Sequence, residues 1–119
     1  MTEQVLIQGV QPDSINEINV ANALSKLGFT YEFQKVFGLA GVRGSQVIDF
    51  LVYTVPKPTP LFVHGRYWHT GARATEDQLK MAELESQTHG FWDTPVIIWE
   101  EDCETVEEAV QAVRKVLMI

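Results

Sequence analysis

Val47-Ile48-Asp49-Phe50-Leu51-Val52 and Leu61-Phe62-Val63-His64-Gly65-Arg66-Tyr67-Trp68-His69 are the two stretches that organise this chain. Both begin as short apolar runs rich in Val, Ile, Leu and Phe, which is typical of buried β-strands. The first run carries one carboxylate, Asp49, in its middle. A buried ionised carboxylate is costly unless something pairs with it or coordinates it. Asp49 therefore either accepts hydrogen bonds from a neighbouring arginine or loop, or belongs to a functional site.

Length and composition indicate one globular domain. The chain has 119 residues and is 45% hydrophobic, enough for a single core, with residues 1–12 as an N-terminal arm. No apolar run approaches the roughly 20 residues of a membrane helix, and Met1-Thr2-Glu3-Gln4 does not start a signal peptide. One cysteine and three histidines favour a reducing, cytoplasmic location and argue against a structural zinc site.

Charge is distributed unevenly along the chain. The formal net charge is −7, but residues 26–73 are basic overall, whereas residues 74–119 hold most of the acids. Such asymmetry is compatible with one face meeting phosphate and another facing solvent. We therefore expect the basic residues around the mouth of a site and the acids of residues 100–108 away from it. The structural alternative is that most of these acids only solvate exposed helices.

Hydrophobic periodicity and helix-start signals predict an α/β fold. Three capping boxes, at Ser14, Thr75 and Thr105, begin predicted helices, the first with Ile15, Ile18, Ala21 and Leu24 on its apolar face. The predicted helices are 15–27, 76–89 and 106–117, and the predicted strands are 29–37, 46–55, 61–64 and 95–99. Pro56-Lys57-Pro58-Thr59-Pro60 reads as a stiff loop between strands. This order predicts a mixed central β-sheet flanked by helices.

The string His64-Gly65-Arg66-Tyr67-Trp68-His69 gives the sequence a family resemblance. With Asp49-Phe50 before it and Trp99-Glu100 after it, the chain resembles the very-short-patch repair (Vsr-like) endonucleases. The order Glu32, Asp49, His69, Asp77 also resembles a branch of homing endonucleases. Both groups belong to the restriction-endonuclease-like superfamily, so the resemblance implies a three-layer fold and a bacterial, phage or mobile-element origin.

The resemblance implies a metal-dependent DNA endonuclease or nickase. Asp49 and the main-chain carbonyl of Val63 would bind Mg²⁺ or Mn²⁺, since a hard cation prefers oxygen ligands. His69 would act as the general base, because an imidazole is partly neutral near pH 7. Asp77 would orient His69, Glu32 would order water or metal, and His64 would serve as a second imidazole.

Double-stranded DNA is the partner that the resemblance implies. Tyr67 and Trp68 would wedge between bases, which costs unstacking energy but distorts the duplex. Arg66 and Arg73 flank this stretch and would contact phosphates. A homodimer, or a fused or separate DNA-recognition module, would be compatible with so small a domain.

Each of these residues also has a structural interpretation. Asp77 at the second position of a helix is favoured by the helix dipole regardless of function. Glu32 on an alternating strand is most often on the exposed face, and a lone His69 is most often a hydrogen-bonded structural histidine. Tyr67 or Trp68 could pack in the core. Glu32, Asp49, His69 and Asp77 occur in the order of the family. The structural interpretations are therefore weaker as a joint explanation of all four residues than as an explanation of any one of them.

Departures from the family pattern limit what the resemblance implies. The superfamily's acid-x-Lys pair is absent, because Val63-His64-Gly65 occupies its place, as in the short-patch branch. Arg66 and Gly71 stand where that branch has zinc ligands, and the segment from His69 to Asp77 is short. T:G mismatch recognition is therefore not implied. The alternatives are a catalytically degenerate nuclease-fold module for DNA binding or assembly, and a small-molecule-binding domain, which no glycine-rich phosphate loop supports.

Overall fold

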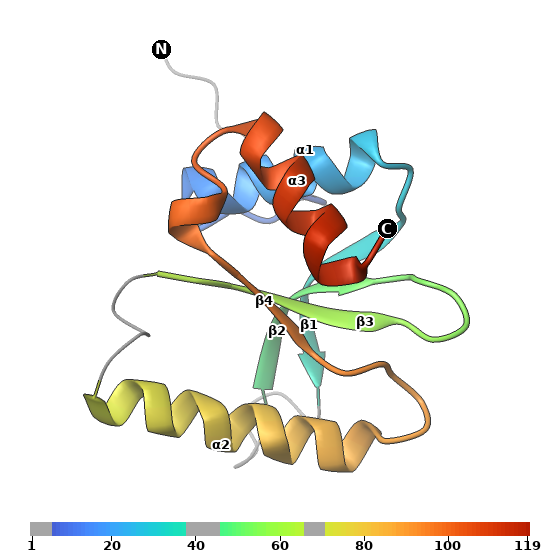
Figure 1. The fold of residues 1–119 in the computed structure, drawn as a ribbon, viewed down its shortest axis with the longest axis vertical. Helices are drawn as coiled ribbons and strands as arrows, with labels where there is room; N and C mark the ends of the chain where they lie inside the picture. Colours follow the sequence, from blue (N-terminus) through green and yellow to red (C-terminus); the bar gives the residue numbers. More distant parts are fainter. Residues whose placement is uncertain (1–5, 38–45, 66–70) are drawn as a thin grey trace.

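A four-stranded sheet lies at the centre of the chain (Figure 1). The computed structural model describes residues 6–37, 46–65 and 71–119. The elements in order are α1 (Ile15–Lys26), β1 (Tyr31–Phe37), β2 (Gln46–Val52), β3 (Thr59–His64), α2 (Gly71–Thr88), β4 (Val96–Trp99), the short 3-10 helix η2 (Glu100–Asp102) and α3 (Val106–Leu117).

The sheet is mixed and follows the order β1-β2-β3-β4. Strands β1, β2 and β3 form an antiparallel meander, and β3 pairs in parallel with β4. The parallel pair is joined by α2, as a crossover connection requires. The carboxyl ends of β3 and β4 therefore meet at the same end of the sheet.

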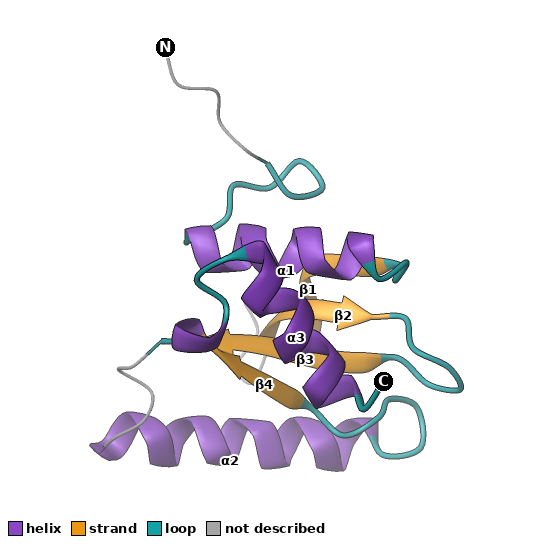
Figure 2. Ribbon diagram, turned by 45° about the horizontal axis from the view of Figure 1, so that its top comes forward, coloured by secondary structure: helices purple, strands orange, loops and turns teal. Residues whose placement is uncertain are grey.

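Helices cover both faces of the sheet (Figure 2). The larger core cluster joins α1 and α3 to one face, around Phe50, Leu24 and Ile98. A smaller cluster of Ile48, Phe62 and Leu84 packs α2 against the other face. The predicted α/β class and mixed, helix-flanked sheet are confirmed. No helix among the described ranges is long and apolar enough to cross a membrane.

Two of the three predicted capping boxes start helices. The Ser14 hydroxyl accepts from the Glu17 amide at 3.3 Å, and the Thr105 hydroxyl accepts from the Glu108 amide at 3.1 Å. Each satisfies one of the amides that a helix start leaves without a partner. Gly28, at φ +83, follows the end of α1 as predicted, because a left-handed conformation suits glycine.

The predictions around Thr75 and Pro60 were wrong. Helix α2 begins at Gly71, so Thr75 lies inside it and Asp77 is not at its second position. Good helix formers at Ala72, Arg73 and Ala74 extend the helix upstream of the apparent capping box. Strand β3 begins at Thr59, and Pro60 pairs with Leu51 inside the sheet. Proline lacks only the amide donor, so it is tolerated at the start of a strand.

The N-terminal arm is anchored to the sheet from Leu6 onward. The Gln8 side chain donates to the Tyr31 carbonyl at 2.5 Å and accepts from the Phe33 amide at 2.8 Å. Ile7 is buried in the larger core cluster. A glutamine side chain thus satisfies the outer edge of β1 in the way a further strand would.

Cys103 is a structural thiol beneath the turn that follows β4. It is fully buried, and its Sγ donates weakly to the Trp99 carbonyl at 3.5 Å. Its own carbonyl accepts from Asn16 at 3.3 Å and from Asn19 at 3.0 Å. Burial raises the pKa of the Cys103 thiol from 9.0 to about 11.

We expect Cys103 to react slowly with thiol reagents in the folded protein. A pKa higher by two units leaves roughly a hundredfold less thiolate at pH 8, and burial slows the reaction further. Because the fold favours the neutral thiol, the contribution of Cys103 to the free energy of unfolding should be complete below pH 9. This contribution should be lost as the pH rises through 11. Colour development with Ellman's reagent, with and without guanidinium, measures the reactivity of the thiol. Equal reaction rates in the folded and unfolded protein would contradict the burial of Cys103.

Candidate functional site

Asp49 lies where the pairing between β2 and β3 stops. The last paired residues are Phe50 and Leu61. Beyond this pair, the Asp49 carboxylate itself accepts from the Val63 amide, with Oδ2 and N 2.9 Å apart. Asp49 is half-buried.

Strands β1 and β2 depart from regular geometry near Asp49. Residues two apart on a strand normally share a face. Ile48 packs in the cluster beneath α2, whereas Phe50 packs in the cluster beneath α1 and α3. On β1, Gln34 has a φ of +53 and lies between Phe33 and Lys35, which pair with Phe50 and Ile48. The sheet is therefore distorted at the position of Asp49.

His64 is the last residue of β3 and is 5% exposed. Its ring lies 5.8 Å from the Phe62 ring and 5.6 Å from the Trp99 ring, the latter edge-on. Trp99 is also its partner in the parallel ladder. The imidazole is thus held by aromatic packing one residue after the Val63 amide that binds Asp49.

Glu100 meets the end of β3 at Gly65. A Cβ atom added to Gly65 would lie 3.1 Å from the Glu100 Oε1. A larger residue at this position would require the Glu100 carboxylate to shift by a few tenths of an ångström. The Glu100 carbonyl accepts from the Asn16 amide group at 2.9 Å, which ties the turn to α1. The parallel β3–β4 pairing therefore brings the Glu100 carboxylate beside the residue that follows β3.

Glu17 is an acid that the sequence interpretation treated only as part of a helix cap. It lies in the first turn of α1 and is 5% exposed. Its carboxylate accepts from the Asp13 amide at 2.7 Å. Burial raises the pKa of Glu17, and the negative charges of Asp13 and Glu100 act in the same direction. Ile15, predicted on the apolar face of this helix, is instead 62% exposed.

We expect Glu17→Gln to raise stability at neutral pH. A carboxyl with a raised pKa stabilises the fold only while protonated, and this contribution is lost as the pH rises above 4.5. Glutamine keeps an oxygen for the Asp13 amide without the buried charge. The expected gain is about 0.5–2 kcal/mol at pH 7 and less at pH 4.

Urea unfolding of both proteins at the two pH values measures this difference. Glu85→Gln is the matched control, since Glu85 is an exposed acid on α2. A loss of stability at pH 7 would show that the ionised Glu17 carboxylate is favourable in the fold.

Glu32 lies on the exposed side of the sheet edge. Its carboxylate accepts from the Tyr53 hydroxyl and lies 3.6 Å from the Lys35 ammonium. Strand β1 pairs it with Leu51. These contacts fit the structural interpretation of Glu32, and none of them joins it to Asp49.

Several other predicted site residues are not placed. Arg66, Tyr67, Trp68 and His69 lie outside the described residues, and only the backbone of Arg73 and Asp77 is described, within α2. Among the side chains that the structure describes, which do not include that of Asp77, no group of three or more His, Cys, Asp and Glu has the arrangement of a metal site. The described contacts join Asp49 to Val63, and they place the Glu100 carboxylate beside Gly65, one residue after His64.

Comparison with known proteins gave no match: no protein-family model, no curated protein sequence and no solved structure is similar to this chain.

Proposed function

We propose that this chain is a metal-dependent endonuclease or nickase acting on double-stranded DNA, with a restriction-endonuclease-like fold. The observation that carries the proposal is the Asp49 carboxylate, which binds the Val63 amide at the point where β2 and β3 separate. The ordered residues of the Vsr-like resemblance support the same assignment.

The donors at this point suit a hard divalent cation. Asp49 offers a carboxylate, and the neighbouring Val63 offers its main-chain carbonyl. Mg²⁺ typically takes one or two carboxylates and keeps several waters, with phosphate oxygens completing the shell. Bound there, Mg²⁺ or Mn²⁺ would polarise the scissile phosphate and stabilise the leaving oxygen.

The remaining residues would position water and the phosphate. His69 would accept the proton of the attacking water, with Asp77 orienting its ring. His64, held against Trp99, would offer a second imidazole near the phosphate.

DNA contacts in this proposal come from the stretch after Gly65. Arg66 and Arg73 would neutralise phosphates, and Tyr67 and Trp68 would wedge into the duplex. Because the net charge is −7, we expect weak binding, and because that binding depends on neutralising phosphates, it should weaken further as salt rises.

Incubation with supercoiled plasmid and Mg²⁺ or Mn²⁺, with and without EDTA, tests the proposal. We expect nicked or linear plasmid only with the metal, and a loss of cleavage when Asp49 is replaced. Cleavage that persists in EDTA would reject the metal-dependent assignment. Binding of duplex DNA in Ca²⁺ without cleavage in Mg²⁺ or Mn²⁺ would favour the degenerate nuclease-fold module.

A further inference from the structure

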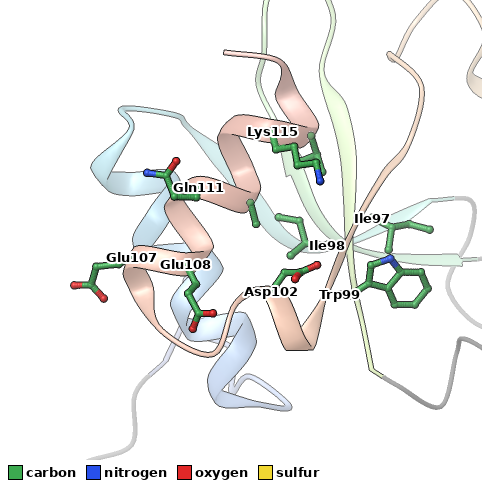
Figure 3. A pocket seen from close by; sticks show the side chains of 10 residues that line it. Ile97, Ile98, Trp99, Asp102, Glu107, Glu108, Gln111 and Lys115 are labelled. Atoms are coloured by element: carbon green, nitrogen blue, oxygen red, sulfur yellow. The ribbon is translucent and has the colours of Figure 1, made fainter.

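A groove runs along the outer edge of β4, beside α3 (Figure 3). Its volume is about 610 Å³. Its floor is apolar and consists of the β4 residues Ile97 and Ile98 together with Ala112 and Val116 of α3. The size falls in the range of binding sites rather than of packing defects.

The rim of the groove is acidic. Asp102, Glu107 and Glu108 line it, against a single cation, Lys115. In Figure 3 these side chains extend from η2 and α3 around the groove. Such a rim favours a cationic occupant and disfavours an anionic one. A second copy of this chain, with net charge −7, would bring further acids to the rim, so the charge argues against a homodimer here.

The edge of β4 sets the conformation of the occupant. Strand β4 is the last in the order β1-β2-β3-β4, so its outer edge has no strand partner within the described ranges. An extended peptide can add to such an edge through main-chain hydrogen bonds while alternate side chains enter neighbouring pockets. An apolar floor with an acidic rim then selects a segment that alternates apolar and basic residues.

We propose that this groove binds an extended segment of another protein, with alternating apolar and Lys or Arg side chains, as a strand added to β4. The proposal rests on the groove and is independent of DNA cleavage. Trp99 links the two regions, because it lines the groove and its ring lies 5.6 Å from that of His64. A basic partner bound here would also offset the negative charge of the chain near its candidate site.

Selection of a random 12-residue peptide library, displayed on phage, against the full chain tests the proposal. We expect enriched peptides to alternate apolar and basic residues. The strongest of them, labelled with fluorescein and titrated by anisotropy, should bind less tightly as salt rises. The double variant Asp102→Asn/Glu107→Gln should weaken its binding at least tenfold.

Glu104→Gln is the matched control, because Glu104 is exposed and does not line the groove. It should leave the peptide affinity unchanged within twofold. Circular dichroism of each variant checks that the fold persists. The proposal is overturned if no peptide is enriched, if the enriched peptides carry no excess of Lys and Arg, or if the double variant binds them as tightly as the unchanged chain. Saturable self-association that the double variant strengthens would instead assign the groove to a second copy.

Discussion

Asp49→Asn is expected to reduce plasmid cleavage by roughly 10²–10³-fold or more, the effect seen when a preorganised electrostatic group is removed from an active site. Asparagine has nearly the same shape as aspartate and keeps one oxygen, so it can still accept from the Val63 amide. It lacks the negative charge that would hold a divalent cation. Stability should stay within about 1 kcal/mol, since the hydrogen bond to β3 is preserved.

Asp49→Ala is the less informative variant, for a reason visible only in the structure. Alanine leaves the Val63 amide without the acceptor it has now, and a buried unsatisfied amide costs about 1–3 kcal/mol. Relief of repulsion among the acids offsets part of that cost. Lost cleavage in this variant would thus mix a chemical effect with a structural one.

Asp93→Asn is the matched control for Asp49→Asn. Asp93 is exposed, and its Oδ1 accepts only from the adjacent Thr94 amide among the contacts described. Rates of plasmid nicking under saturating Mg²⁺, together with thermal unfolding curves, measure both variants. If Asp49→Asn nicks plasmid as fast as the control, Asp49 is not a metal ligand.

Phe50→Ala is expected to destabilise the fold by about 3–5 kcal/mol, the cost of deleting a large buried aromatic side chain. Phe50 is 0% exposed. Its ring lies 5.5 Å from the Tyr31 ring and 5.0 Å from the Phe33 ring, so the lost contacts include two aromatic pairs. In a domain of this size, the midpoint of thermal unfolding should fall by roughly 10–25 °C.

Phe91→Ala provides the comparison, since the Phe91 side chain is 75% exposed in the turn after α2. It should change the free energy of unfolding by less than about 0.5 kcal/mol. Calorimetry or guanidinium unfolding of the two variants measures the difference. Similar stabilities would mean that the aromatic cluster beneath α1 and α3 is not the centre of the core.

Local patterns in the sequence were sufficient for the class of fold. Apolar runs predicted all four strands, and capping signals at Ser14 and Thr105 predicted where α1 and α3 begin. These signals act between residues close in sequence, so they can be recognised without knowledge of tertiary contacts. They failed at Thr75, where a capping pattern lies inside a helix, because helix propensity upstream outweighed it.

The sequence by itself marked Asp49 as a carboxylate that a buried strand must accommodate, and the strand after it as its neighbour. Only the tertiary structure decided that the β2–β3 ladder ends there and that its partner is the Val63 amide. It also brought the Glu100 carboxylate beside Gly65, at the end of β3. The hydrophobic periodicity of the sequence assigns a residue to one face of a strand or helix. Strand register and helix packing decide which distant carboxylates meet. Both register and packing depend on contacts across the whole chain.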